Sequence, residues 1–205
     1  MNTLANDAIL LGDSIRIGYQ PVVERELAAE FNVWAPDTNC HDTRKTLAHL
    51  DEWVAQRVKG REDRAVVHLN CGLHDLKFTD ADNKPAQTPH VPLEEYKQNL
   101  QRILGTLLNE ASLPPTRIIW ALTTPVIDQR HLTKGFIRRQ ADVENYNAVA
   151  SAVCKQLGIP VHDLHALVVA NEPERIITPD GVHYTDAGQE VLGRAVAARL
   201  RSAVM

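Results

Sequence analysis

Ile9-Leu10-Leu11-Gly12-Asp13-Ser14 is the stretch that decides how this chain folds. The apolar run is typical of a strand buried inside a parallel sheet, and it stops at a glycine, which permits a sharp turn. Ligands of open α/β sheets bind just beyond the carboxyl ends of the strands, so this stretch places Ser14 where a reacting serine is expected. Taken alone, the Asp-Ser pair would only cap the helix that follows, and the rest of the chain has to decide between the two interpretations.

Strand and helix patterns alternate along the rest of the chain. Helices are predicted where apolar residues recur every three or four positions. We expect strands at 8–12, 32–35, 64–70, 117–122 and 159–162, helices at 21–31, 43–58, 93–110, 139–157, 164–170 and 185–203, and long loops at 76–92 and 123–138. This alternation predicts a three-layer α/β/α sandwich around a mostly parallel, five-stranded sheet of flavodoxin-like type. Both long loops follow strands and should lie on the same edge of the sheet as Ser14, and loops of this length are usually functional.

Length and composition fit one globular domain over residues 1–205, with 44% hydrophobic and 23% charged residues. A net charge of −4 gives no basic footprint for nucleic acid, and no apolar run is long enough to span a membrane. Cys40, Cys71 and Cys154 are an odd number of cysteines, and the first residues do not resemble a secretory signal. These features predict free thiols in a reducing cytoplasm, while the oligomeric state stays open.

A second polar stretch, Asp180-Gly181-Val182-His183, lies near the other end of the chain. A serine hydroxyl is a weak nucleophile that needs a base within hydrogen-bond reach, and histidine suits that role. A carboxylate then has to fix the tautomer of the histidine and stabilise the imidazolium. An Asp three residues before a His on a turn can place both side chains side by side. Alone, the stretch would be a polar turn before the last helix; together with Gly-Asp-Ser after the first strand, catalysis becomes the favoured interpretation.

Two further polar stretches follow the third and second predicted strands. In the first, which runs from Asn70 to Asp75, Gly72 would let a backbone amide approach a substrate, and the ring of His74 can donate an N–H toward a developing oxyanion. The second runs from Thr38 to Thr43 and precedes a helix, whose unpaired N-terminal amides suit an oxyanion. A glycine turn with a surface histidine, and an ordinary capped helix start, are the alternatives.

In this order, the Gly-Asp-Ser, the glycine-bearing turn before Asp75 and the Asp-x-x-His resemble the sequence blocks of the SGNH hydrolases, also called the GDSL esterase/lipase family. Each block alone is weak, but the ordered set is specific and covers essentially the whole chain. The resemblance implies that Ser14 is the nucleophile, His183 the base and Asp180 its partner. It also implies that the amide of Ser14 forms part of an oxyanion hole and that no cofactor is needed.

The chain departs from this family in two places. The family usually has a glycine in its second block and an asparagine in its third, both of which donate to the oxyanion; here His41 and His74 stand at those positions. A backbone amide can still donate at position 41, whereas a neutral imidazole donates from one nitrogen only. Losing one oxyanion donor costs roughly 3 kcal/mol of barrier. We nevertheless expect an oxyanion hole formed by the amides of Ser14 and His41 and the ring of His74.

The expected reaction is hydrolysis of a carboxylic ester through an acyl-enzyme. We expect Asp13, Arg16, Gly72 and Asp75 to border the substrate, and Phe136, Arg138 and Arg139 to lie near its pocket. The polar loops and the 5% of aromatic residues favour a short acyl group, such as acetyl, on a polar or carbohydrate alcohol.

Two other functions stay open at this point. One is a metal-dependent hydrolase that uses some of the nine histidines, for which the stretch from His162 to His165 is a candidate cluster. The other is a non-catalytic binding module that keeps the fold with a damaged oxyanion hole. The expected partner is a small ester, with neither nucleic acid nor membrane involved.

Overall fold

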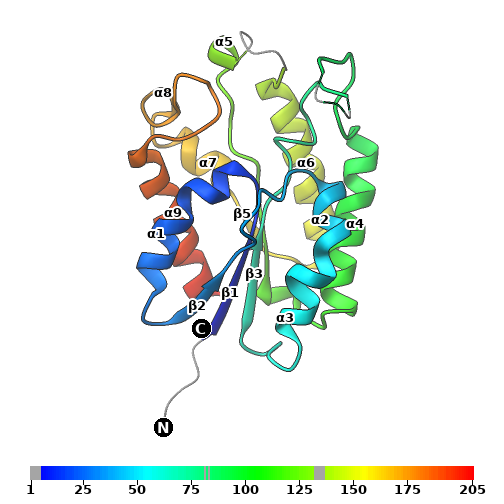
Figure 1. The fold of residues 1–205 in the computed structure, drawn as a ribbon, viewed down its shortest axis with the longest axis vertical. Coiled ribbons are helices and arrows are strands. Elements are labelled where there is room, and N and C mark those ends of the chain that lie inside the picture. The colour runs from blue at the N-terminus through cyan, green and yellow to red at the C-terminus, as the bar shows by residue number, and fades with distance from the viewer. Residues whose placement is uncertain (1–5, 81, 83, 132–136) are drawn as a thin grey trace.

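The computed structural model describes residues 6–80, 82, 84–131 and 137–205 of the chain. In these ranges, five strands form one sheet in the order β2-β1-β3-β4-β5, and every neighbouring pair is parallel (Figure 1). The strands are β1 (Asn6–Leu11), β2 (Phe31–Trp34), β3 (Ala65–Leu69), β4 (Ile118–Ala121) and β5 (Val161–His162). This is the doubly wound order of the flavodoxin type. The predicted α/β/α architecture is confirmed, with a sheet that is wholly parallel.

Helices cover both faces of the sheet (Figure 1). One layer contains α1 (Ser14–Leu27), α7 (Leu164–Val169) and α9 (Asp186–Ser202); the other contains α2 (Thr43–Leu50), α3 (Gln56–Val58), α4 (Leu93–Asn109) and α6 (Gln140–Leu157). A π-helical turn, Asp51–Ala55, joins α2 to α3, and a 3-10 turn, Pro115–Arg117, precedes β4. Two short helices, α5 (Asp128–His131) and α8 (Pro173–Ile176), lie at the top of the view in Figure 1.

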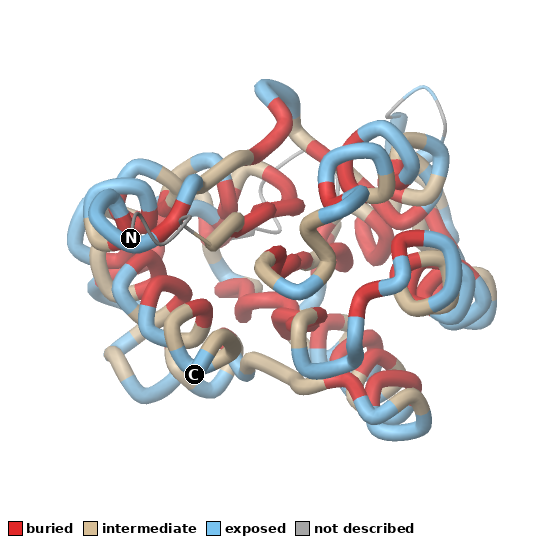
Figure 2. Tube along the Cα trace, turned by 90° about the horizontal axis from the view of Figure 1, so that it is seen from below, coloured by how far each residue is buried: buried red, intermediate tan, exposed pale blue. Residues whose placement is uncertain are grey.

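The core runs through the sheet. Every residue of β3 and β4 is buried, as is β1 from Ala8 onward, and Figure 2 shows the buried trace in the interior between the helices. Strands covered on both faces are apolar throughout, which explains the continuous runs in the sequence. Among the described residues, no helix is both long and apolar enough to cross a membrane.

The helices α1 and α9 pack tightly against each other. Both begin at the carboxyl edge of the sheet and run away from it side by side (Figure 1). At Gly193 a Cβ atom would lie 2.5 Å from the Cβ of Val22, so the two backbones approach as closely as they do only because this residue is a glycine. This seam fixes the beginning of one helix relative to the other.

The first helix begins at Ser14, and the prediction that it begins at Pro21 is wrong. The carboxylate of Asp13 accepts a hydrogen bond from the Ile15 amide and caps the helix at its true start. Pro21 lies inside α1, where its missing N–H leaves the carbonyl of Ile17 without its helical donor. Ile17 is 44% exposed, so water can take the place of that donor.

Other boundaries differ for local reasons. The helix expected at 43–58 is interrupted by the π-helical turn. The last strand is only two residues long, because Gly158 ends α6 in the left-handed region and Pro160 follows it. The short helices α5 and α8 were not predicted, since four residues give too little periodicity to detect.

Candidate active site

Ser14, His183 and Asp180 form one hydrogen-bonded chain at the carboxyl edge of the sheet. The Oγ of Ser14 lies 2.8 Å from Nε2 of His183, and Nδ1 of the same ring lies 2.5 Å from Oδ2 of Asp180. The serine and the histidine are 169 positions apart in the sequence. This is the arrangement in which a histidine can take a proton from a serine while a carboxylate holds the ring.

The position of Ser14 follows from the residues beside it. It is the first residue of α1, so its amide has no acceptor within the helix and points out of the helix end. At Gly12 a Cβ atom would lie 2.7 Å from the Cβ of Arg16, so the turn between β1 and α1 requires a residue without a side chain. The tight turn places the hydroxyl of Ser14 directly beyond the end of β1.

The turn that carries Asp180 and His183 is fixed by the aspartate itself. Its Oδ1 accepts hydrogen bonds from the Thr178 hydroxyl and from the amides of Val182 and His183, at 2.7, 2.9 and 3.0 Å. Gly181 has a φ of +79°, which a residue with a side chain adopts only at a cost. Burial alone would raise the pKa of Asp180, but the hydrogen bonds from His183, Thr178 and the backbone amides together hold it well below its usual range. The carboxylate is therefore ionised at any working pH.

The amide of His41 is covered by a neighbouring side chain. The φ of His41 is +58°, a conformation typical of glycine, which agrees with its place in the second block. The amide donates to Oδ1 of Asn39 at 2.7 Å. An oxyanion bound here would have to displace this carboxamide oxygen, so the predicted role of the His41 amide requires Asn39 to move.

The ring of His74 lies at the site in its neutral form. Burial, followed by the nearby charge of Arg138, lowers the pKa of His74 to about 2. The centroid of its ring lies 4.7 Å from that of His41. A neutral imidazole carries one N–H, so His74 can offer one hydrogen bond at most. Its Nδ1 is buried, with no hydrogen-bond partner among the described residues.

A small cavity of about 190 Å³ is lined by both Ser14 and His183. Its lining combines residues from the first turn of α1, the loop before α2, the loop after β3, the segment before α6 and the turn before α9. They are Asp13, Ser14, Asn39, Leu73, His74, Arg138, Val182 and His183. Arg138, predicted to lie near the substrate pocket, lines this cavity, whereas Arg139 stacks over the ring of Phe78, and Phe136 lies outside the described residues. Asn39, Leu73 and Val182 were missed, although each stands within two residues of a predicted site residue.

Of the predicted substrate-binding residues, Asp13 lines this cavity and Arg16 does not. Arg16 is 2% exposed, and its guanidinium donates to the Thr38 carbonyl at 2.7 Å and to the side chain of Gln20 at 2.5 Å. We therefore correct its role: Arg16 holds the loop before α2 against α1. The amide of Cys40 donates to the carbonyl of Gly12 and ties the same two segments together.

Gly72 and Asp75 also have structural roles that differ from the predicted ones. A Cβ atom at Gly72 would lie 2.0 Å from Oγ1 of Thr123, so packing against the loop after β4 accounts for this glycine. Asp75 is 0% exposed, and its Oδ1 accepts hydrogen bonds from the amide and the hydroxyl of Thr43 at 3.0 and 2.6 Å. Burial raises the pKa of Asp75 to about 8. It joins the loop after β3 to the start of α2 and does not face a substrate.

The side chains of the candidate metal cluster at 162–165 make hydrogen bonds to other residues. His162 pairs with His68 at 3.1 Å, Asp163 caps α7 through the Ala166 amide, and His165 contacts Gln140 at 2.7 Å. Within the part of the chain that the structure describes, no three histidine, cysteine or acidic side chains are grouped as metal ligands would be. The three cysteines are buried and free.

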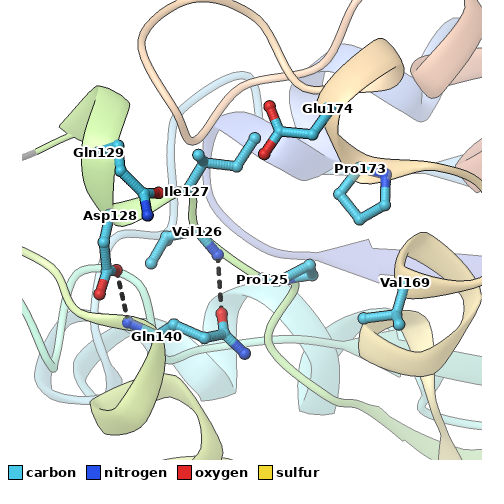
Figure 3. A pocket seen from close by; sticks show the side chains of 9 residues that line it. All are labelled: Pro125, Val126, Ile127, Asp128, Gln129, Gln140, Val169, Pro173 and Glu174. Carbon is cyan, nitrogen blue, oxygen red and sulfur yellow. Dashed lines mark hydrogen bonds between the residues drawn. The ribbon is translucent and has the colours of Figure 1, made fainter.

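A larger cavity of about 390 Å³ is lined by residues of α5 and α8 and of the segments next to them (Figure 3). Figure 3 shows Gln140 on one side of it, with its amide bonded to Asp128 and its side chain bonded to the Val126 amide. The Ile127 amide, on the wall of this cavity, donates to the carbonyl of Gly181 at 2.9 Å. Ser14 does not line this cavity, but the cavity wall supports the turn that carries His183.

The fold and the site define a parallel α/β protein of the SGNH hydrolase type, with a serine, a histidine and an aspartate aligned at the carboxyl edge of the sheet. The model of the GDSL-like lipase/acylhydrolase family matches residues 10–191, and the chain belongs to this family. A GDSL esterase/lipase of Arabidopsis thaliana is 32% identical over 152 residues, which make up 69% of this chain. The match covers 61% of the length of that relative, so the chain corresponds to only part of it.

Solved structures share the whole fold. A lipase/acylhydrolase from Enterococcus faecalis matches with a TM-score of 0.74 at 20% identity, and covers 96% of each chain. A variant of an acetyl xylan esterase from Geobacillus stearothermophilus also matches with a TM-score of 0.74, at 18% identity, over 98% of this chain and 97% of that one. At 18–20% identity, these similarities show a shared fold and nothing further.

Proposed function

We propose that this protein is a serine esterase that hydrolyses short acyl esters of polar alcohols through an acyl-enzyme. The observation that carries the proposal is the unbroken chain from the Ser14 hydroxyl through His183 to the ionised Asp180. Membership of the GDSL-like lipase/acylhydrolase family supports the reaction class.

In the first half of the proposed reaction, Oγ of Ser14 attacks the ester carbonyl while Nε2 of His183 takes the hydroxyl proton. Asp180 keeps the proton of the ring on Nδ1 and stabilises the imidazolium. The carbonyl oxygen becomes an oxyanion, for which the Ser14 amide, unpaired at the start of α1, is a donor fixed by the backbone. His183 then gives its proton to the leaving alcohol, and the acyl group stays on Ser14.

In the second half, water replaces the alcohol. His183 takes a proton from the water as it attacks the acyl carbon, and the carbonyl oxygen again bears negative charge. Collapse of this intermediate releases the carboxylic acid and returns the proton to Oγ of Ser14. Each bond formed has a matching bond broken, and every proton passes through the same imidazole nitrogen.

The size of the catalytic cavity favours a short acyl group. About 190 Å³, lined partly by Asp13, Asn39 and Arg138, leaves little apolar room for a long chain. Two of the similar structures are acetyl xylan esterases, which agrees with an acetyl group on a carbohydrate alcohol. Both arguments concern the substrate, and the proposed roles of Ser14, His183 and Asp180 do not depend on them.

A panel of p-nitrophenyl esters from acetate to decanoate tests the proposal. We expect the highest kcat/KM for the shortest esters and no turnover by Ser14→Ala. A fluorophosphonate probe should label the wild type and leave Ser14→Ala unlabelled. Fastest turnover of the octanoate or decanoate would contradict the short-acyl assignment. A folded wild type that neither turns over esters nor reacts with the probe would show a non-catalytic binding protein.

A further inference from the structure

The turn that carries Asp180 and His183 is fixed in shape by hydrogen bonds within itself. The Thr178 amide donates to the carbonyl of His183 at 2.8 Å, and the Gly181 amide donates to the carbonyl of Thr178 at 3.0 Å. Together with the hydrogen bonds to Oδ1 of Asp180, these contacts hold His183 beside its carboxylate. They do not fix where the turn lies relative to Ser14, because Ser14 belongs to α1. Contacts between the turn and other parts of the chain must do that.

Two carbonyls that flank Asp180 accept hydrogen bonds from the segment that runs from Ile127 into α5. The Ile127 amide donates to the carbonyl of Gly181 at 2.9 Å. Nη1 of Arg130, a residue of α5, donates to the carbonyl of Ile177 at 3.0 Å. Ile177 lies three residues before Asp180 and Gly181 lies directly after it. The segment therefore contacts the turn on both sides of the carboxylate that holds His183.

Arg130 also contacts α8, the helix from which the turn starts. Its Nη2 donates to the carbonyl of Glu174 at 3.0 Å and to Oε2 of the same residue at 2.6 Å. Glu172, directly before α8, has a φ of +54°, so the entry into α8 carries a conformational cost that contacts such as these must offset. The side chain of Glu174 is 70% exposed, so water screens its ion pair, and the bonds from Arg130 to the two backbone carbonyls matter more.

The helix that carries Arg130 is attached to α6 (Figure 3). Oδ1 of Asp128, the first residue of α5, accepts a hydrogen bond from the Gln140 amide at 2.9 Å, and the side chain of Gln140 accepts one from the Val126 amide at 3.1 Å. Arg130 therefore donates from a backbone that α6 holds in place. A guanidinium can donate to several acceptors at once from one rigid plane, so this one side chain can join α5 to both α8 and the turn.

We propose that Arg130 is a positioning residue for ester hydrolysis, which places the turn so that Nε2 of His183 reaches Oγ of Ser14. The inference rests on the proposed esterase function and adds to it a residue that does not line the cavity with Ser14. Arg130 acts through the backbone carbonyls that it holds. Its loss leaves the bond between His183 and Asp180 intact, because that bond lies within the turn, and displaces both side chains together. Attack by Ser14 should then slow while binding of a short ester is preserved.

The kinetics of p-nitrophenyl acetate hydrolysis test the inference. Arg130→Met should lower kcat and kcat/KM equally, by at least about tenfold, because a displacement of about 1 Å between reacting groups is enough for such a loss. Arg130→Lys keeps a cationic donor for the Ile177 carbonyl and should recover part of the lost rate. The rate of labelling by a fluorophosphonate should fall in step with kcat, since labelling needs the same activated hydroxyl of Ser14.

Two control variants separate positioning from a general loss of charge. Arg175→Met removes an arginine of α8 that pairs with Glu172 and is 77% exposed, and it should leave kcat unchanged. Glu174→Gln removes the ion pair with Arg130 but keeps the bonds to the carbonyls, and it should lower kcat less than about twofold. A folded Arg130→Met protein with the kcat of the wild type, a loss expressed only in KM, or an equal loss in Arg175→Met would overturn the inference.

Amide hydrogen exchange keeps the test independent of turnover. Arg130→Met should speed exchange of the amides within 178–183, whereas exchange in β3 and β4 should stay as in the wild type. Arg175→Met should change neither. If β3 and β4 also exchange faster, Arg130→Lys takes the place of Arg130→Met in the same comparison.

The outcomes of the exchange experiment tell the two proposals apart. Unchanged exchange of the turn in the Arg130 variants would overturn the positioning role, whatever the activity. Faster exchange of the turn, in a protein whose wild type hydrolyses no ester, would instead place the failure in the proposed catalysis.

Discussion

Replacing Asp180 by asparagine should stop the reaction without unfolding the turn. Oδ1 of Asp180 accepts three hydrogen bonds, from Thr178, Val182 and His183, and an asparagine oxygen can accept the same three. The other atom changes from an acceptor to an N–H donor, 2.5 Å from Nδ1 of His183. Nδ1 must then become the acceptor, so the proton of the ring moves to Nε2, where it faces Ser14.

The magnitude follows from that exchange of tautomers. With its proton on Nε2, His183 cannot take the proton of the serine, and the imidazolium has lost its counter-charge. The comparable change in a Ser-His-Asp site lowers kcat by about 10⁴-fold, which corresponds to about 5.5 kcal/mol of barrier. We expect a loss of this order for the hydrolysis of p-nitrophenyl acetate, with KM little changed.

The control and the refuting outcome are simple. Asp163→Asn alters a different aspartate, which caps α7 and does not line the cavity with Ser14, and it should leave kcat unchanged. Circular dichroism and thermal unfolding verify that Asp180→Asn is folded. A folded Asp180→Asn protein with less than a tenfold loss would show that this carboxylate does not orient the base, and the proposed mechanism would fail.

Three further changes probe the surroundings of the site. Asn39→Ala uncovers the His41 amide and should raise kcat/KM for a short ester about threefold or more. Asn39→Asp should lower kcat/KM at pH 7, because a carboxylate binds the amide more strongly than a carboxamide oxygen does. A loss of activity in Asn39→Ala would show instead that the Asn39 side chain helps catalysis. Gly72→Ala forces a Cβ to within 2.0 Å of Thr123 and should lower the free energy of unfolding by about 1–3 kcal/mol in urea, and an unchanged midpoint would contradict the packing described here. Burial lowers the pKa of His162 to about 4, so below pH 6.5 the unfolded chain binds a proton that the folded chain does not, and the free energy of unfolding decreases as the pH falls. The decrease between pH 7 and pH 5 should be about 2 kcal/mol smaller in His162→Gln than in the wild type. Equal decreases in the two proteins would refute this prediction.

The sequence predicts the fold well because buried parallel strands leave a strong pattern. The run that became β4 is wholly apolar, β1 is apolar from Ala8 onward, and β3 is apolar except for His68, while the helices between them keep their periodicity. The start of α1 was missed because Pro21 suggests a helix beginning and the cap that decides the start, Asp13, was assigned to chemistry as well. The sequence pattern alone does not tell whether Asp13 caps the helix, borders the substrate or does both.

The site shows the same division. The approach of Ser14 to His183 is predictable from two motifs and a topology that brings strand ends to one edge. The burial of Arg16 and Asp75 is not, because a charged residue near a motif reads the same whether it faces a substrate or a neighbouring loop. Asn39 and Arg138 enter the cavity through loop conformations that local sequence does not determine.

The seam between α1 and α9 has a consequence for how the protein would fail on heating. Ser14 is the first residue of α1, and His183 lies three residues before α9, so the packing of the two helices sets the position of Ser14 relative to His183. A shift of α9 along α1 near Gly193 would lengthen the distance between Oγ of Ser14 and Nε2 of His183 while the sheet stayed intact. On heating, ester hydrolysis should then be lost several degrees below the temperature at which the sheet unfolds, so activity would report on the packing of α1 against α9.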